Sequence, residues 1–277
     1  MSGFSAEWLA LREPADARAR NAALAEAAVH QLAGHDPLRI VDLGAGTGAN
    51  LRASAPYFGP HQHWHLLDYE PALLAQARRA LAAWADGCET QDDALLLTKD
   101  SRRITVDFTV ADLARSLAEI GRPRPHLVTA SAFFDLVSAP FIDAFAAEVA
   151  HLNAAFLTVL TCNGRDMWAP PHAGDAAIAA AFAADQGKDK GFGPALGNAA
   201  SDHLERAFRS HDYAVERADS PWRLGPEDGG LVRALAEGTA AAAVETGRIA
   251  ATEAAAWAEA RRSASCEIGH TDLLAWR

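Results

Sequence analysis

Three glycines at every second position, Gly44, Gly46 and Gly48, directly follow a short apolar run at 38–43. A backbone that approaches a polar or anionic ligand closely at the start of a helix needs residues without a Cβ atom. The composition after the glycines is helical, so the segment predicts a strand, a ligand-binding loop and a helix. The glycines alone do not identify the ligand, because Gly44-x-Gly46-x-x-Ala49 also fits the dinucleotide fingerprint.

Three acidic residues narrow the choice of ligand. Asp68 ends the second predicted strand, where a carboxylate can accept both hydroxyls of a ribose, a group that NAD and S-adenosylmethionine share. Asp42 precedes the loop, and a carboxylate buried there is costly unless a cation or a hydrogen bond compensates it. S-adenosylmethionine offers an ammonium, whereas the pyrophosphate of NAD would be repelled. Asp112 follows the third predicted strand, where its carboxylate can accept the adenine amino group.

Strands and helices alternate around these residues. Helices are predicted at 16–33, 71–86, 112–120 and 140–152, and strands at 38–43, 63–68, 104–110, 126–130 and 155–161. This alternation is typical of a parallel sheet with helices on both faces. A loop-rich segment at 163–198 with a helix near 175–184 follows, then a helix at 199–210, a strand at 213–218, a helical stretch at 231–262 and a strand at 265–276.

The sequence resembles the class I S-adenosylmethionine-dependent methyltransferases. VDLGAGTG at 41–48 is similar to their first motif, Asp68 to their ribose-binding acid and Ala111-Asp112 to their adenine-contacting step, and 130–135 takes the place of their fourth motif. The resemblance covers about residues 38–161 and continues weakly beyond. The fourth motif lacks the Pro-Pro-Tyr/Phe and Pro-Cys patterns of subfamilies that modify nucleobases.

The resemblance implies an α/β, doubly wound, mostly parallel seven-stranded sheet. Its last strand is antiparallel, and helical and loop insertions after strands five and six cover the acceptor pocket. A single domain is expected over 1–277, with a helical cover at 1–36, a cofactor-binding core at 37–161, an acceptor-side lid at 162–198 and terminal strands with a helical insertion at 199–277.

The resemblance and the chemistry of individual residues together give a set of candidate site residues. The residues expected to bind the cofactor are Asp42, Gly44, Ala45, Gly46, Asn50, Asp68, Tyr69, Ala111, Asp112, Leu113 and Ser131. The candidate general bases are Asp135 and His172, and the alternative for Asp135 is a helix cap. The candidate acceptor-binding residues are Phe134, Asn163, Arg165, Trp168 and Lys190. If Arg165 and Lys190 face inward, they favour an acceptor that carries a carboxylate or phosphate; otherwise both are solvated.

Composition excludes several classes of function. The chain has 25 Lys and Arg and 36 Asp and Glu, a net charge of −11, which disfavours nucleic acid and anionic membranes as partners. Its three cysteines form no C-x-x-C pair, so a cytoplasmic protein without disulfides is expected.

The run His61-x-His63-x-His65 has a spacing that could bind a metal ion, but catalysis is expected to need no metal. The stretch 231–262 is expected to form a helical cover or a homodimer surface.

These features predict methyl transfer from S-adenosylmethionine to a small-molecule acceptor by in-line displacement. Catalysis would come chiefly from positioning and exclusion of water. Two alternatives stay open, an NAD-dependent oxidoreductase and a cofactor-binding protein without turnover. Asp42 and Asp112 favour S-adenosylmethionine over NAD as the cofactor, and the alternative without turnover stays open.

Overall fold

The computed structural model describes residues 4–277, and within them ten strands form one sheet. The strand order is β3-β4-β5-β2-β1-β6-β7-β10-β8, with β9 added beside β10. The parallel strands at its centre are β5 (Arg102–Val110), β2 (His61–Asp68), β1 (Leu38–Leu43), β6 (Leu127–Ser131) and β7 (Ala155–Ala169). β10 (Ser265–Trp276) runs antiparallel between β7 and β8 (Ala214–Asp219), so the expected antiparallel last strand is confirmed.

The expected count of seven strands is too low. A hairpin of β3 (Gly87–Gln91) and β4 (Ala94–Lys99) extends the sheet antiparallel to β5, and the short β9 (Trp222–Leu224) pairs with β10. Every residue of β3 is exposed, so this strand lacks the apolar pattern by which a strand is predicted. Its order comes from backbone pairing with β4.

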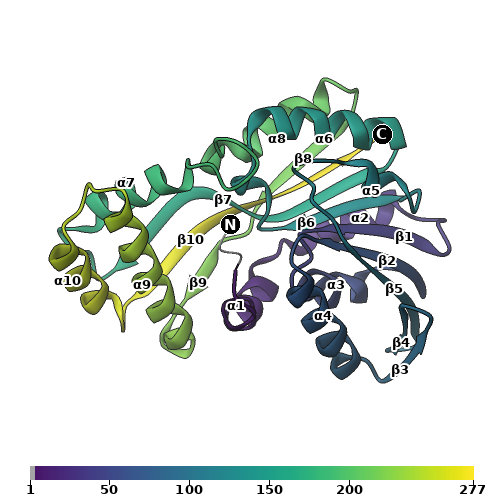
Figure 1. The fold of residues 1–277 in the computed structure, drawn as a ribbon, viewed down its shortest axis with the longest axis horizontal. Coiled ribbons are helices and arrows are strands. Elements are labelled where there is room, and N and C mark those ends of the chain that lie inside the picture. The colour runs from purple at the N-terminus through teal and green to yellow at the C-terminus, as the bar shows by residue number, and fades with distance from the viewer. Residues whose placement is uncertain (1–3) are drawn as a thin grey trace.

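Helices lie on both faces of the sheet (Figure 1). On one face lie α6 (Ala139–Leu152), α8 (Ala200–Arg209) and the short α5 (Ala118–Gly121), and on the other lie α2 (Ala22–Gln31), α3 (Ala49–Ser54) and α4 (Pro71–Trp84). Neighbouring residues of β1 enter opposite cores, Ile40 on the α4 side and Val41 on the α6 side, and both are fully buried.

In the part of the chain that the structure describes, no helix is both long and apolar enough to cross a membrane.

Two helix predictions are wrong in detail. The predicted helix at 16–33 is two helices, α1 (Ala6–Ala19) and α2, because the chain turns at Arg20 and Asn21, whose side chain caps α2 by accepting the N–H of Leu24. The predicted helix at 112–120 is reduced to α5 and preceding turns. Asp112 accepts the N–H of Ala114 there, a local bond that competes with helix formation.

The strand β7 continues eight residues beyond its predicted end at 161, so 163–169 is strand and not the start of a loop-rich lid. Its pairing with β10 is long and irregular, with register shifts between Ile268 and His270 and between Thr271 and Leu273. The far part of this pair carries α7 (Asp175–Gln186), α9 (Gly229–Glu245) and α10 (Ala251–Arg261), at the left of Figure 1. A separate apolar cluster around Trp168, Trp222 and Trp257 holds them in place.

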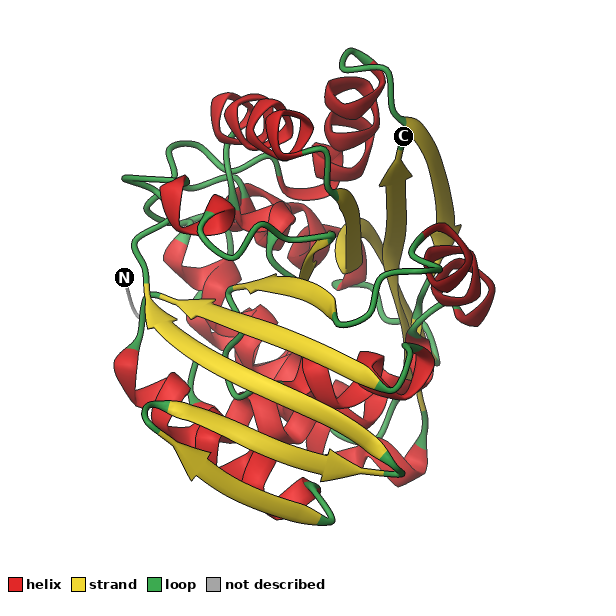
Figure 2. Cartoon of the chain, turned by 90° about the vertical axis from the view of Figure 1, so that its right-hand side faces the viewer, coloured by secondary structure: helices red, strands yellow, loops and turns green. Residues whose placement is uncertain are grey.

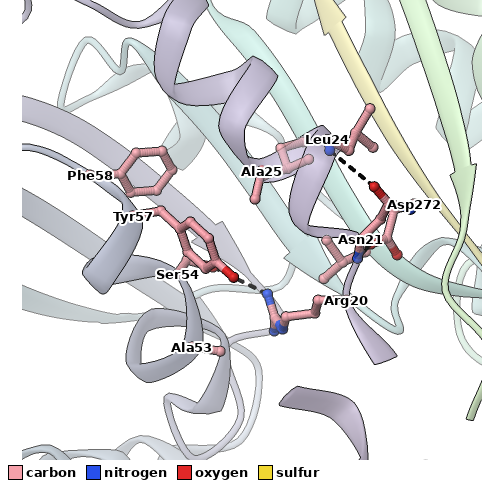
Figure 3. A pocket seen from close by; sticks show the side chains of 11 residues that line it. Arg20, Asn21, Leu24, Ala25, Ala53, Ser54, Tyr57, Phe58 and Asp272 are labelled. Carbon is pink, nitrogen blue, oxygen red and sulfur yellow. Dashed lines mark hydrogen bonds between the residues drawn. The ribbon is translucent and has the colours of Figure 1, made fainter. Parts of the chain in front are cut away.

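The buried carboxylate of Asp272 joins β10 to three other segments. Its Oδ1 accepts the N–H of Leu160 on β7 at 2.8 Å and the hydroxyl of Ser220 at 2.5 Å, and its Oδ2 accepts the N–H of Asn21 at 2.9 Å. Leu160 has φ of +59°, a left-handed conformation that is rare for a branched residue, and the bond from Asp272 holds it there. Asp272 and Asn21 also border a small pocket between α2 and α3 (Figure 3).

Replacing Asp272 should therefore destabilise the fold. Asp272→Ala leaves three donors without an acceptor and should lower the free energy of unfolding by about 3 kcal/mol. Asp272→Asn should cost less, because its one remaining oxygen can keep the Oδ1 bonds while its amide faces the N–H of Asn21. Urea unfolding measures both, with the exposed Asp93→Ala as the control, expected to stay within about 0.5 kcal/mol of wild type. Equal unfolding curves for Asp272→Ala and wild type would contradict this role.

Candidate active site

The glycine loop connects the carboxyl end of β1 to α3, and its three glycines have φ of +58°, +54° and +77°. Neighbouring side chains also require the absence of Cβ. A Cβ on Gly44 would lie 2.9 Å from a ring carbon of Phe133, and one on Gly46 would lie 3.0 Å from Leu9 Cδ1 on α1. The loop is thus held between the chain after β6 and the N-terminal helix, with its backbone in the compact form expected for a ligand-binding loop.

Asp68 binds the glycine loop directly. Its Oδ2 accepts the N–H of Gly46 at 2.8 Å and its Oδ1 accepts the N–H of Glu70 at 2.9 Å. Burial raises the pKa of this carboxyl, and the two backbone N–H groups oppose the rise. An ionised carboxylate has about four acceptor positions, so Asp68 retains capacity for a ligand's hydroxyls beside the loop.

Asp42 is fully buried and is linked to Arg20 through Asn50. The Asn50 amide nitrogen donates to Asp42 Oδ1 at 2.6 Å, and its oxygen accepts from Arg20 at 2.8 Å. Among the described residues, Asp42 Oδ2 has no hydrogen-bond partner. Burial raises the pKa of Asp42 to about 7, although Asn50 and Arg20 act in the opposite direction. Asp42 is therefore compensated from within the chain, and one of its oxygens remains unpaired.

The end of β5 lies next to the end of β2. The N–H of Ala111 donates to the carbonyl of Asp68 at 2.9 Å, which brings the predicted adenine-side and ribose-side segments together. Ala111 and Leu113 are buried, whereas the Asp112 side chain is one-third exposed and 3.3 Å from Arg115 Nε. Tyr69 is 56% exposed, so its ring stands free beside this edge.

The two phenylalanines in the segment after β6 have different roles, one against the glycine loop and one in the core. Ser131 ends β6 and is half-buried, and Ala132, with φ of +52°, turns the chain away from the sheet. Phe133 then packs under Gly44. Phe134, expected to bind the acceptor, is instead fully buried, with ring centroids 5.0 and 5.2 Å from those of Phe145 and Phe156. It is a core residue, because the turn at Ala132 directs it into the sheet–α6 interface.

Asp135 follows in the same segment, and its environment suits a general base. Its Oδ1 is buried and has no hydrogen-bond partner among residues 4–277. Burial raises the pKa of Asp135 to about 6, and Arg12 and the N–H of Cys162 partly oppose the shift. Its carboxyl is therefore in a protonation equilibrium near neutral pH, which is the condition for general acid–base chemistry.

A second ionisable group, His270 on β10, escaped the sequence analysis. It is 6% exposed, pairs in register with Cys162, and its Nδ1 has no hydrogen-bond partner in the described chain. Burial lowers the pKa of His270 to about 3, and Arg12 acts in the same direction. Its sequence context, Ile-Gly-His-Thr, carries no motif. Only the pairing of β10 with β7 places it beside Cys162, whose backbone N–H bonds to Asp135.

Arg12 of α1 lies beside the polar group formed by Asp135 and His270. It forms a two-bond ion pair with Asp16 at 2.8 and 3.1 Å, and the Trp222 indole donates to Asp16 at 2.9 Å. The guanidinium lies 5.0 Å from the Trp222 ring, which is itself 5.0 Å from the His270 ring. The ion pair and the ring contacts therefore hold Arg12 of the N-terminal helix in a fixed position.

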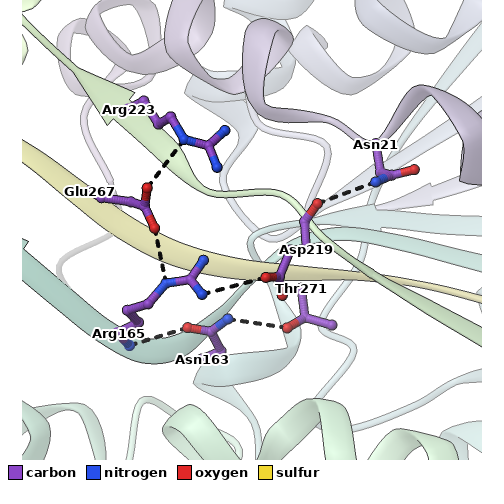
Figure 4. A network of polar contacts seen from close by, with 7 residues as sticks. All are labelled: Asn21, Asn163, Arg165, Asp219, Arg223, Glu267 and Thr271. Atoms are coloured by element: carbon purple, nitrogen blue, oxygen red, sulfur yellow. Dashed lines mark hydrogen bonds and ion pairs between the residues drawn. The ribbon is translucent and has the colours of Figure 1, made fainter.

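Arg165 and Asn163 lie on β7 and take part in a network of polar contacts with β10 and β8 (Figure 4). Arg165 forms ion pairs with Glu267 at 3.2 Å and Asp219 at 3.4 Å. Asn163 donates to Thr271 at 3.3 Å and accepts the N–H of Arg165. The strands approach so closely that a Cβ on Gly269 would lie 2.2 Å from Asn163 Oδ1. Arg165 thus pairs with two acids of this chain, and its contact with an anionic acceptor stays a prediction.

Three further predicted residues also have structural partners. Lys190 lies 3.2 Å from Asp185, which Lys188 contacts at 2.6 Å, so its charge is compensated. His172 is exposed, and its Nδ1 accepts the N–H of Gly174 at the turn before α7, so its role as a base stays a prediction. Trp168 is 8% exposed and packs edge-on against Trp257 in the apolar cluster. Of the three, only Trp168 lies on β7, in a stretch for which the sequence predicts a loop.

Comparison with known proteins identifies the fold. No family model and no curated protein matches the chain. A cyclopropane-fatty-acyl-phospholipid synthase-like protein from Lactobacillus casei superimposes with a TM-score of 0.57 at 15% identity, covering 98% of this chain and 94% of that one. The cyclopropane synthase MmaA2 from Mycobacterium tuberculosis does so with a TM-score of 0.50 at 12% identity and the same coverage. Together with the strand order around β1, these similarities show that the chain has the fold of the class I S-adenosylmethionine-dependent methyltransferases.

Proposed function

We propose that the protein transfers the methyl group of S-adenosylmethionine to a small-molecule acceptor by in-line displacement. The observation that carries the proposal is the meeting of three segments at the carboxyl edge of the sheet. Asp68 binds the glycine loop through Gly46, and its carbonyl accepts the N–H of Ala111, so the loop, the ribose-side acid and the Ala111-Asp112 step lie side by side. Ligands of open α/β sheets bind at this edge.

The sheet order favours S-adenosylmethionine over NAD. The dinucleotide fold continues its sheet with parallel strands in the order 3-2-1-4-5-6. In this chain the antiparallel β10 is inserted between β7 and β8 instead. The acidic residues point the same way, because Asp42 and Asp68 near the loop suit a cofactor with an ammonium and a sulfonium and repel a pyrophosphate.

For catalysis, the unpaired buried atoms Asp135 Oδ1 and His270 Nδ1 are the candidate contacts to the acceptor. A buried polar atom without a partner costs about 1–3 kcal/mol, so a bound molecule that supplies the missing bonds is stabilised there. Asp135 would accept the acceptor's proton as the methyl group is transferred, and His270 would orient the acceptor as a neutral imidazole. Because Arg165 and Lys190 are paired with acids, the reason for expecting an anionic acceptor is removed.

Binding should distinguish the two cofactors. We expect calorimetry to show that S-adenosylhomocysteine binds to the wild-type protein and NAD does not, since the edge carries acidic groups and the loop follows Asp42. Binding of NAD with no response to S-adenosylhomocysteine would contradict the proposed function. If S-adenosylhomocysteine binds, an assay with labelled S-adenosylmethionine and a metabolite extract tests turnover as distinct from binding.

Asp68→Ala should weaken S-adenosylhomocysteine binding by about 1–3 kcal/mol, because the ribose hydroxyls lose their charged acceptor and Gly46 loses its anchor. Glu70→Gln is the matched control, since it removes an exposed negative charge two residues away and keeps an oxygen for the N–H of Ala72. Wild-type affinity in Asp68→Ala would move the ribose site elsewhere.

The pH dependence should identify the base. Asp135 acts only when ionised, so methyl transfer should decline as pH falls through about 6, roughly tenfold per pH unit at lower pH. His270, with a pKa of about 3, stays neutral over this range and adds no second limb. Asp135→Asn should lower kcat and abolish the acidic limb, whereas the exposed His172→Ala should keep both. An unchanged acidic limb in Asp135→Asn would exclude Asp135 as the base.

A further inference from the structure

One face of β2 and β5 carries no covering helix. Between β5 and β6 the described chain forms only the four-residue α5, where a doubly wound fold has a full crossover helix. Trp64 and Leu66 of β2 and Val106 of β5 are fully buried on the α4 side, so their neighbours in sequence point to the other face. In Figure 2 the strands of this half of the sheet lie in front of the helices with no helix drawn over them.

Three metal-ligating side chains meet on this open face. Asp107 is the direct register partner of His65, and His63 precedes His65 on the same face of β2. Both imidazoles approach one carboxylate oxygen: His63 Nε2 lies 2.6 Å from Asp107 Oδ2, and His65 Nδ1 lies 3.2 Å from it. The three ligand atoms all lie within 4.8 Å of one another. The tertiary structure thus adds a carboxylate to the histidine spacing seen in the sequence.

We propose that His63, His65 and Asp107 bind one divalent transition-metal ion, with Zn²⁺ as the ion of choice and water in the remaining position. Two imidazole nitrogens and one carboxylate oxygen form a donor set that suits Zn²⁺ and its neighbours and is too poor in oxygen for Ca²⁺ or Mg²⁺. Ligand atoms about 2.0–2.1 Å from a tetrahedral Zn²⁺ lie about 3.3 Å apart. The His65–Asp107 separation is already close to this value, and His63 needs a small outward movement.

The surroundings allow an ion to reach the cluster and to be held there. The side chains of His63, His65 and Asp107 are 32%, 17% and 36% exposed, so the cluster is open to solvent but rests on rigid strands. The nearby Arg39 donates from its Nε to the carbonyl of Arg124 at 2.8 Å and forms no ion pair with Asp107, which leaves this carboxylate to the two imidazoles.

The ion would be structural. His65 precedes Asp68 by three residues, which on a strand corresponds to about 10 Å from the carboxyl edge where the proposed cofactor binds. A bound ion would join β2 to β5 on the face that lacks a helix. Methyl transfer should therefore continue after chelation, while thermal stability should depend on the metal.

The test uses the full chain without a polyhistidine tag, stripped with EDTA and titrated with ZnCl₂ by calorimetry. We expect one Zn²⁺ per chain and a Tm that rises with Zn²⁺ concentration. His63→Gln and Asp107→Asn should each weaken binding by roughly 100-fold, because each removes a ligand while keeping the size of the side chain. His61→Gln is the control: His61 lies on the same strand face but pairs with Asp36 at 2.7 Å, so binding should be unchanged.

Wild-type Zn²⁺ affinity in both His63→Gln and Asp107→Asn, or no Zn²⁺ binding by the stripped wild-type protein, would overturn the proposal. Circular dichroism of the metal-free variants shows whether each is folded. Loss of methyl transfer on chelation that Zn²⁺ restores in wild type but not in Asp107→Asn would overturn the structural role. The calorimetric result does not depend on whether the protein is a methyltransferase, so the two proposals fail separately.

Discussion

The pairing of β7 with β10 is the interaction on which the rest of the structure depends. It reverses the direction of the sheet at its edge and extends beyond it to carry α7, α9 and α10. Its two register shifts fall at Gly269 and at Asp272, on either side of His270 and Thr271, and the Asp272 side chain bonds the backbone of β7 at Leu160. Asp272 then joins this pair to the start of α2 through the N–H of Asn21. A uniform ladder would not place the Asp272 side chain in this way.

Burial has the same effect on the ionisable groups at the candidate site. It raises the pKa of Asp42 to about 7 and of Asp135 to about 6, and it lowers the pKa of His270 to about 3. In each case the shift favours the neutral form, because charge is poorly solvated away from water. The site thus combines carboxyls that titrate near neutral pH with a histidine that stays neutral, which suits the acid–base role proposed for Asp135.

The cations near the site act within the chain. Arg165, Lys190 and Arg12 each pair with an acid, and Arg20 donates to Asn50, which in turn donates to Asp42. In a chain of net charge −11, such pairing relieves repulsion between carboxylates. In the proposed function, specificity for the acceptor would therefore come from shape and from the unpaired atoms of Asp135 and His270.

Local sequence determined the elements that this protein shares with its fold class. The apolar run before Gly44 and the spacing of Asp68 and Ala111-Asp112 predicted the central strands and the edge at which they end, because period, turn glycines and strand ends are local properties. The structure brings these segments together as expected. The same reasoning did not detect the exposed β3, because its stability depends on a neighbouring strand and not on its own pattern.

Only the tertiary structure decided which polar residues are available to a ligand. Arg165, Lys190 and His172 have suitable chemistry in the sequence, but partners distant in the chain or in their own turns engage them. His270 and the His63–His65–Asp107 cluster become visible only through strand register, since their members come together from separate segments. A sequence states which donors and acceptors exist. Which of them remain unpaired depends on the fold, because each hydrogen bond or ion pair made inside the protein removes that group from binding anything else.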